Sequence, residues 1–258
     1  MSKIRKYIDA ENSNGRNILS VFLTSGFPDP DNFTELALKV LEAGADMLEI
    51  GFPFSDPLAD GPIIQYSSTI AIKNGVNLHK SFSYAERIKK NTNKPIILMG
   101  YANPIISFGI KKFAESCYNS GVDGIIIPDV PIEEYKSFYS ADFNGIDRVL
   151  LISPTTSGER IKIIDNKSEG FIYCVSISGT TGNAKARKDI EFIKRCHNQI
   201  RRNKMLVGFG ISTTDDVKNY SPYCDGIIVG SAVIKSLMND DKNAIKTLEL
   251  INELKSAT

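Results

Sequence analysis

The chain has 258 residues, of which 42% are hydrophobic and 24% are charged, and its formal net charge is +1. This near-neutral balance gives no electrostatic reason to expect a nucleic acid or an anionic membrane surface as partner. No apolar run is long enough to span a membrane, and the N-terminus lacks the apolar stretch of a signal peptide. We therefore expect a soluble, cytoplasmic protein.

The cysteines and histidines exclude two further classes of site. None of the four cysteines forms a C-x-x-C pair, so we expect reduced, mostly buried thiols. His79 and His197 are the only histidines, and neither has a cysteine or aspartate at ligand spacing. We therefore expect no metal site.

Short apolar runs alternate with amphipathic segments along the whole chain. Ile4, Tyr7 and Ile8 share a helical face, which predicts a helix before the first apolar run. Eight apolar, partly β-branched runs predict buried strands. These strands are expected at Ile18–Leu23, Met47–Gly51, Pro95–Gly100, Gly124–Ile127, Arg148–Ile152, Phe171–Ser176, Met205–Phe209 and Gly226–Val229.

A helical pattern follows each of these runs. Asp29 is expected to cap the first helix, with Pro30 at its first position and Gly44 just past its end. The second helical region, Ile64–Asn91, is interrupted near Gly75. Further helices are expected at Ile110–Tyr118, Glu133–Tyr139, Glu159–Asn166, Asp189–Cys196, Thr213–Tyr220, Ala232–Leu237 and Ile245–Leu254.

Eight strands alternating with helices predict a parallel sheet that closes into a (β/α)8 TIM barrel, with residues 1–258 as a single domain. The N-terminal helix and the short helix 232–237 after the eighth strand are additions to that barrel. Asp123–Asp129 reads DGIIIPD and Asp225–Ser231 reads DGIIVGS, an echo that two related half-barrels would produce. Chance similarity between isoleucine-rich strands is the alternative.

Glu49 and Asp60 are candidate active-site residues, because active sites of such barrels lie at the C-terminal ends of the strands. Glu49 is flanked by Leu48 and Ile50, so burial should raise its pKa and let it donate a proton near neutral pH. The alternative is a structural glutamate paired with a buried Lys or Arg. Asp60 lies on the loop behind this strand and is either a second site carboxylate or an ordinary loop acid. Tyr173, on the sixth strand, is a substrate contact or a core tyrosine.

The positions of the lysines and glycines relative to the strands exclude one class of reaction and indicate another. Lys94 and Lys204 precede their strands, so no lysine lies at a strand exit, which argues against a Schiff-base aldolase. Gly210, Gly230 and Ser231 follow the seventh and eighth strands, where this fold commonly binds phosphate through backbone N–H groups and a helix N-terminus. Ordinary turns are the alternative. The residues alone therefore indicate a phosphate-ester enzyme that uses acid–base carboxylates.

The run LEIGFPFSDPLADG, residues 48–61, resembles the signature of the tryptophan synthase α subunit family. Six more motifs resemble that family in the same order along the chain. They are TSGFP at 24–28, LMGYANP at 98–104, PDVPIEE at 128–134, SxxGxTG at 176–182, GFGIS at 208–212 and VGSA at 229–232. The resemblance implies a TIM barrel and a lyase of tryptophan biosynthesis, which cleaves indole-3-glycerol phosphate to indole and glyceraldehyde 3-phosphate.

The resemblance also assigns roles to residues. Glu49 would protonate C3 of the indole ring and can also take the proton of the glycerol hydroxyl, and Asp60 would hold the indole N–H. Thr181 would reach the site from a mobile lid, residues 177–188, in which Ile177 departs from an arginine of some members. The substrate slot would consist of Phe22, Met99, Ile126, Ile152, Tyr173 and Phe209, and the phosphate site of Gly182, Gly210, Gly230 and Ser231.

A partner is implied as well. The family works as an α2β2 complex with a β subunit that holds pyridoxal phosphate, so no cofactor is expected in this chain. The interface would include Pro53, Asp56, Pro57, Asn103 and Pro131. The apolar loop around Pro53 independently suggests a covered surface, unless the loop folds over its own barrel. Two rival functions are another phosphate-binding barrel enzyme and a non-catalytic activator of a β partner.

Overall fold

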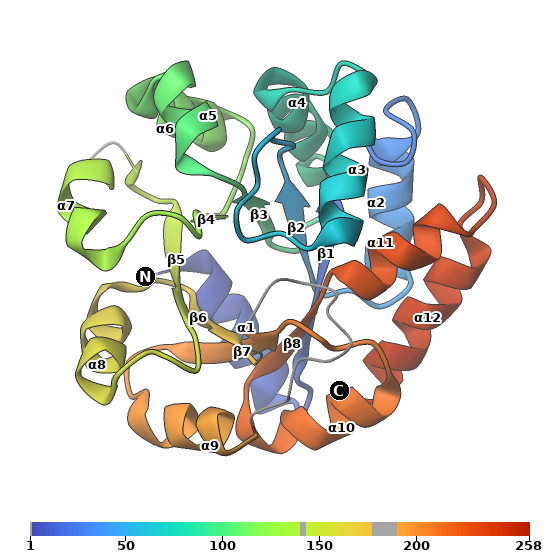
Figure 1. Ribbon diagram of the computed structural model, residues 1–258. Helices are drawn as coiled ribbons and strands as arrows, with labels where there is room; N and C mark the ends of the chain where they lie inside the picture. Colours follow the sequence, from blue (N-terminus) through green and yellow to red (C-terminus); the bar gives the residue numbers. More distant parts are fainter. Residues whose placement is uncertain (1, 140–142, 177–189) are drawn as a thin grey trace.

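The computed structural model describes residues 2–139, 143–176 and 190–258. Eight parallel strands form a closed barrel in which each strand pairs with the next along the chain and β8 pairs with β1 (Figure 1). This confirms the predicted (β/α)8 barrel, and every strand lies within one residue of the predicted bounds. The strands are β1 Ile18–Thr24, β2 Met47–Gly51, β3 Ile96–Met99, β4 Gly124–Ile126, β5 Asp147–Ile152, β6 Phe171–Val175, β7 Lys204–Gly208 and β8 Gly226–Val229.

The helices surround the strands, except for α1, which lies across the centre of the view (Figure 1). Among the described residues, none of these helices combines the length and the apolar character that a membrane span needs. The helices are α1 Lys3–Ser13, α2 Phe33–Glu42, α3 Pro62–Lys73, α4 Leu78–Lys89, α5 Ala102–Phe108, α6 Ile110–Asn119, α7 Tyr135–Phe138, α8 Gly158–Lys167, α9 Ile190–Gln199, α10 Thr214–Tyr220, α11 Ser231–Met238 and α12 Ile245–Ser256, with 3-10 turns η1 Ile132–Glu134 and η3 Ser221–Tyr223.

Three helical predictions need correction. α2 begins at Phe33 and not at Pro30, because the Asp29 carboxylate accepts hydrogen bonds within its own turn, from the Asp31 N–H at 3.0 Å and the Asn32 side chain at 2.7 Å. The predicted helix over 133–139 is split into η1 and the short α7. The sequence interpretation missed α5 altogether.

The barrel interior is filled by inward-facing side chains of the strands and by side chains of α1. Ile4 and Ile8 of α1 are fully buried and join the same apolar cluster as the inward-facing strand residues. α1 therefore closes the N-terminal mouth of the barrel as an apolar plug. Every strand contributes at least one residue to this cluster, and β6 contributes three. The strand residues are Ile18, Met47, Ile97, Ile126, Val149, Phe171, Tyr173, Val175, Leu206 and Ile228.

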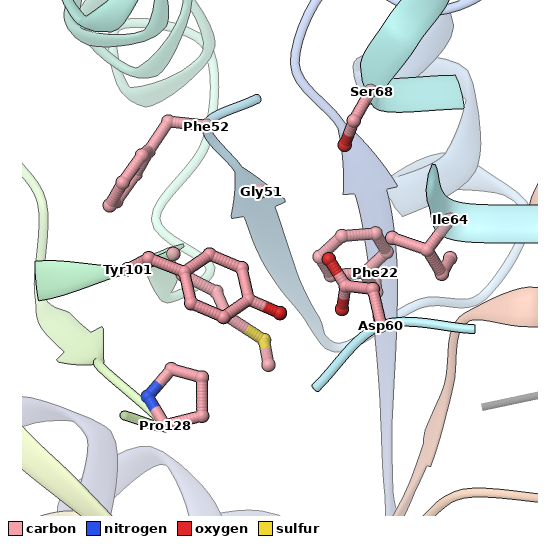
Figure 2. Close-up of a pocket in the computed structure, with 10 residues that line it drawn as sticks. Phe22, Gly51, Phe52, Asp60, Ile64, Ser68, Tyr101 and Pro128 are labelled. Atoms are coloured by element: carbon pink, nitrogen blue, oxygen red, sulfur yellow. The ribbon is translucent and has the colours of Figure 1, made fainter. Parts of the chain in front are cut away.

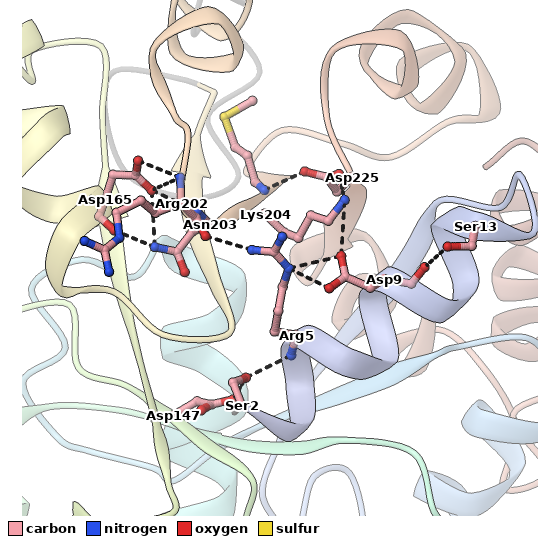
Figure 3. A network of polar contacts seen from close by, with 11 residues as sticks. Ser2, Arg5, Asp9, Ser13, Asp147, Asp165, Arg202, Asn203, Lys204 and Asp225 are labelled. Atoms are coloured by element: carbon pink, nitrogen blue, oxygen red, sulfur yellow. Dashed lines mark hydrogen bonds and ion pairs between the residues drawn. The ribbon is translucent and has the colours of Figure 1, made fainter.

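Charged side chains hold α1 against the barrel (Figure 3). The Arg5 Nε donates to both Asp9 carboxylate oxygens at 3.0 and 2.9 Å, and its Nη1 donates to the Arg202 carbonyl at 2.8 Å. Lys204 at the start of β7 lies 3.5 Å from Asp9 and 2.9 Å from Asp225. With this mouth closed, the C-terminal mouth is left for a ligand.

An acidic residue precedes each even-numbered strand and bonds twice to the preceding strand. Its N–H donates to the carbonyl of that strand's first or second residue at 2.8–3.0 Å, and its carboxylate accepts from the N–H of the same residue at 2.7–3.3 Å. We call this arrangement a carboxylate clasp. The four clasps are Asp46 with Leu19, Asp123 with Ile96, Glu169 with Arg148 and Asp225 with Met205.

The clasps account for the echo between DGIIIPD and DGIIVGS. Asp123 and Asp225 open these two segments and make the same two backbone bonds before β4 and β8. Because Asp46 and Glu169 make the same bonds before β2 and β6, the clasp is common to all even-numbered strands, and the half-barrel interpretation stays a prediction.

The plug can be tested with Ile8→Ala. Removing a fully buried side chain leaves a cavity in the interior, so the free energy of unfolding should fall by about 2–5 kcal/mol in urea denaturation. Ile163→Ala is the matched control, since Ile163 on α8 is 47% exposed and should lose less than about 0.5 kcal/mol. Equal losses in the two variants would contradict the plug.

Candidate active site

Glu49 lies in the middle of β2, between two residues that point outward. Leu48 and Ile50 pack in the layer between strands and helices, so the Glu49 side chain points into the barrel, where it is fully buried. The Ser20 hydroxyl donates to Oε1 at 2.8 Å, whereas Oε2 has no hydrogen-bond partner in the part of the chain that the structure describes. Burial raises the Glu49 pKa from 4.5 to about 7, and the Ser20 hydrogen bond opposes this shift.

This environment decides between the two interpretations of Glu49. Desolvation is the largest cause of its raised pKa, and among the described residues no Lys or Arg forms an ion pair with it. A structural glutamate paired with a buried cation would have its pKa lowered instead. Glu49 is therefore a buried carboxyl that holds a proton at neutral pH in a substantial fraction of molecules.

Asp60 is the second perturbed carboxyl, at the end of the loop that follows β2. Burial raises its pKa from 3.8 to about 6, and a hydrogen bond from the Tyr101 hydroxyl opposes the shift. The same hydroxyl accepts the Ala59 N–H at 3.1 Å. Tyr101, just after β3, thus fixes the loop and the carboxylate together, and Figure 2 shows its hydroxyl directed at Asp60.

A cavity of about 20 Å³ lies at the C-terminal mouth, which is room for about one water molecule (Figure 2). Asp60 lines it, whereas Glu49 lies one interior layer below Gly51, another lining residue. An aromatic ligand would therefore require the lining side chains to move apart. The cavity is lined by Phe22, Gly51, Phe52, Asp60, Ile64, Ser68, Met99, Gly100, Tyr101 and Pro128.

Two glycines at strand ends leave space for neighbouring aromatic rings at the mouth of the barrel. A Cβ atom on Gly51 would lie closer than 3.0 Å to the Phe22 ring, and one on Gly208 would lie closer than 3.0 Å to the Tyr173 ring and hydroxyl. Because real Cβ atoms do not approach so closely, Phe22 and Tyr173 depend on glycine at these positions for their places in the mouth.

Most of the predicted apolar slot faces the barrel interior. Ile126 and Tyr173 belong to the interior cluster, and Met99 and Phe209 pack against it. The rings of Tyr173 and Phe209 meet edge to face, with centroids 6.0 Å apart. Burial raises the Tyr173 pKa, and the charges of Glu49 and Asp60 add to the shift.

Ile152 is the exception in this set. It is 1% exposed and packs in the outer layer between strands and helices, whereas its neighbour Leu151 packs against the interior cluster. Near the end of β5, Leu151 is thus the apolar side chain that packs against the interior, and the assignment of Ile152 to the substrate slot stays a prediction.

The loop after β7 has an unusual backbone. Phe209 and Gly210 have φ values of +73° and +71°, and a left-handed conformation is unfavourable for a bulky residue such as Phe209. The Ser176 hydroxyl donates to the Gly208 and Phe209 carbonyl oxygens at 2.9 and 2.5 Å, which stabilises this turn. A strained turn held by a fully buried serine indicates a functional position.

The loop after β8 leads directly into α11. Gly230 is the N-cap residue and Ser231 the first residue of this helix. The first N–H groups of an α-helix have no partner within the helix, so they can bind an anion. Two further predicted residues, Thr181 and Gly182, lie outside the described residues, as does the proposed lid 177–188.

The loops after β2, β3 and β4 form one connected surface. The rings of Phe54 and Tyr101 lie 5.7 Å apart, and the Asp129 carboxylate accepts the Ala102 N–H at 3.0 Å. Leu58 is 84% exposed and Ile106 is 59% exposed. Of the predicted interface residues, Pro53 and Pro57 are half-buried, and Asp56, Asn103 and Pro131 are exposed.

Part of the apolar loop after β2 does fold over its own barrel. Phe52 is 3% exposed and packs against Phe113. Leu58, by contrast, is the most exposed of the large apolar side chains in the described part of the chain. The loop is therefore anchored inside by one aromatic residue and presents another apolar residue to solvent.

The sequence interpretation gave no role to Ser20, Tyr101, Ser176 or Leu58. Ser20 had a usable signal, because it lies two residues before Phe22 and must share its face of the strand. The sequence places Tyr101 at a strand exit and Ser176 at the start of the SxxGxTG motif, but no role could be assigned because their partners Asp60 and Phe209 are far away in sequence.

The buried Glu49 should make stability depend on pH. A carboxyl whose pKa is raised from 4.5 to about 7 binds more protons in the folded state, so stability falls as pH rises through this interval. Above pH 8 the cost is about 3 kcal/mol, at about 1.4 kcal/mol for each pH unit between the two pKa values.

Glu49→Gln removes this charge, so the variant should unfold at higher urea than the wild type at pH 8, and the difference should shrink toward pH 5. Asp56→Asn, at an exposed carboxylate, is the control and should show no such trend. A Glu49→Gln variant that is less stable than the wild type at pH 8 would argue against a desolvated carboxylate.

Comparisons with known proteins agree with this arrangement. The family model described as "Tryptophan synthase alpha chain" matches residues 8–258. A tryptophan synthase alpha chain of Petrotoga mobilis is 43% identical over 244 residues, which cover 93% of each chain. One of Prochlorococcus marinus is 40% identical over 258 residues, covering 98% of this chain and 90% of the relative.

Solved structures give the same result. The crystal structure of a tryptophan synthase alpha chain from Legionella pneumophila has a TM-score of 0.88 and 30% identity, and the match covers 100% of this chain and 97% of that one. A Mycobacterium tuberculosis tryptophan synthase structure has a TM-score of 0.91 and 28% identity, covering 99% and 98% of the two chains. With a family model that spans nearly the whole sequence, this chain belongs to the tryptophan synthase α chain family.

Proposed function

We propose that this chain cleaves indole-3-glycerol phosphate to indole and glyceraldehyde 3-phosphate, with Glu49 as the acid–base residue. One observation supports this most strongly: a fully buried carboxyl with a pKa of about 7 lies beneath an aromatic-lined mouth that carries a second carboxyl. The pKa of an acid–base catalyst is most useful near the working pH, because both protonation states are then available.

The reaction needs one proton delivered and one proton removed. Neutral Glu49 gives its proton to C3 of the indole ring, which makes the ring an electron-accepting iminium. The bond between C3 and the glycerol carbon then breaks, its electron pair returns to the ring, and the adjacent hydroxyl becomes the aldehyde carbonyl. Glu49, now charged, takes the hydroxyl proton, so the residue ends as it began.

Asp60 is suited to a different role in the same step. Burial raises the pKa of both carboxyls, and the Tyr101 hydroxyl stabilises the charged form of Asp60 through a hydrogen bond. A carboxylate that accepts the indole N–H offsets the positive charge that forms on the ring. The Tyr101 hydrogen bond holds this carboxylate in place.

The phosphate is assigned to the loops after β7 and β8. Gly210 and the first turn of α11, which begins at Ser231, offer backbone N–H groups. By resemblance Gly182 adds a further contact and Thr181 reaches the site. The apolar slot for the indole ring is assigned to Phe22, Met99, Ile126, Ile152, Tyr173 and Phe209, and Leu151 packs against the interior beside it.

The partner is a tryptophan synthase β subunit, which receives the indole for tryptophan synthesis in an α2β2 complex in the cytoplasm. The pyridoxal phosphate belongs to that subunit, and this chain acts with its own side chains alone. The connected surface around Leu58, Ile106 and Asn103 supports an apolar docking face.

The rival functions fit less well. Lys94 Nζ donates to the Leu41 and Ala45 carbonyl oxygens at 2.8 and 2.7 Å, at the closed end of the barrel, so it is no Schiff-base lysine. A non-catalytic activator would have no need of two carboxyls with pKa values raised into the working range.

The function is tested by incubating the protein with indole-3-glycerol phosphate, with and without β subunit, and following indole. Glu49→Gln and Asp60→Asn should each reduce kcat by about 10²–10⁴-fold. In the wild type, kcat should fall as pH rises above about 7, because Glu49 loses its proton. Wild-type turnover in Glu49→Gln would remove this residue from the mechanism.

The docking face is tested with Leu58→Asp. Leu58 is 84% exposed, so the charge should not affect folding, but it should weaken binding to β subunit in calorimetric titration by about tenfold or more. Tyr118→Asp, at a 71% exposed apolar side chain on α6, is the control and should bind normally. Equal affinity of both variants would place the partner elsewhere.

A further inference from the structure

Ser20 is a buried polar residue that the reaction described above does not use. It lies on β1 between Ile18, which belongs to the interior cluster, and Phe22, which lines the cavity at the C-terminal mouth, and it is fully buried. Its Oγ lies 2.8 Å from Glu49 Oε1, on the neighbouring strand β2. A serine in an interior layer of apolar side chains needs a hydrogen-bond partner, and here that partner is the acid–base residue.

The hydrogen bond makes the two oxygens of the Glu49 carboxyl inequivalent. Oε1 accepts from Ser20, while Oε2 is buried without a partner among the described residues. In the neutral carboxyl the proton can then reside on Oε2 without breaking the Ser20 contact. We propose that Ser20 is a positioning residue, whose hydroxyl orients Glu49 so that Oε2 carries the transferred proton; this rests on the proposed function of Glu49.

Without Ser20 the carboxyl would lose the contact that fixes its orientation. A carboxyl group can rotate about its terminal bond with little preference, because this torsion is broad. The Ser20 contact selects one orientation before the substrate binds. Such preorganisation favours catalysis, since small errors in the position of a proton donor are costly.

The surroundings of Glu49 leave few other groups to perform this task. Among the described residues, Tyr173 of β6 belongs to the interior cluster and Tyr7 of α1 packs against it, while Asp60 acts on Tyr173 from the mouth. Desolvation and the Ser20 hydrogen bond are the two causes of the shift in the Glu49 pKa. Ser20 is thus the hydrogen-bond donor that stabilises the charged form of the Glu49 carboxyl.

The test is Ser20→Ala, which removes one hydroxyl and keeps the backbone. We expect kcat to fall about tenfold, the factor that corresponds to about one lost hydrogen bond, while KM stays within about twofold because Ser20 does not line the cavity at the mouth. The decline of kcat at alkaline pH should move to higher pH, since the charged form of Glu49 loses its donor. Ser20→Cys, with a weak S–H donor, should be intermediate in both respects.

Ser81→Ala is the matched control. Ser81 on α4 is also fully buried and its hydroxyl is paired, with Ser25 at 2.9 Å, but it lies in the outer layer. It should keep the wild-type pH profile even if its stability falls. Ser20→Ala with an unmoved pH profile and wild-type kcat would overturn the proposal and leave Ser20 a packing residue.

A direct titration separates this proposal from the function on which it rests. Protein with ¹³C-labelled glutamate carboxyls is titrated by NMR, and the Glu49 signal is identified by its loss in Glu49→Gln. In Ser20→Ala the midpoint should rise relative to the wild type, and an unchanged midpoint would refute the contact. This outcome does not depend on indole formation, so inactivity of Glu49→Gln and of Ser20→Ala can be judged separately.

Discussion

The chemistry of this protein depends on one energetically unfavourable feature, the burial of the Glu49 carboxyl inside the barrel. Water would hold this group charged at neutral pH, whereas the interior raises its pKa to about 7. The fold tolerates the cost because the surrounding layers are complete, with Leu48 and Ile50 packed outward and the mouth filled by aromatic rings. The packing of the barrel, and not a neighbouring charge, therefore raises the Glu49 pKa to a value at which this group can donate a proton near neutral pH.

The two ends of the barrel have different roles, since one stabilises the fold and the other carries the candidate active site. At the N-terminal end α1 fills the opening and the carboxylate clasps tie the strand starts together, so charges there serve stability. At the C-terminal end the loops carry Asp60, Tyr101 and the strained turn at Phe209, where polar groups are arranged for a ligand. This separation is typical of the fold and lets one end vary without loosening the other.

The sequence predicted the strands well because parallel strands buried on both faces appear as continuous apolar runs. That same feature hid the direction of individual side chains: in the run RVLLI nothing distinguishes Leu151 from Ile152, and only the register of β5 shows which one points inward. Glu49 was evident because a charge interrupts apolar residues. The start of α2 was misjudged because the Asp29 side chain satisfies its own turn, and pairs such as Tyr101 with Asp60 arise only when separate loops meet.

The carboxylate clasps suggest how such a barrel can be divided. Each clasp joins an odd-numbered strand to the next even-numbered strand, so the barrel can be divided into four two-strand units. In each unit one backbone–backbone and one backbone–carboxylate hydrogen bond connect the two strands. A circular permutation that opens the chain between units, after β2, β4 or β6, leaves both partners of every clasp on one continuous segment. The clasps thus mark the units in which a barrel of this kind can be reordered, exchanged or copied.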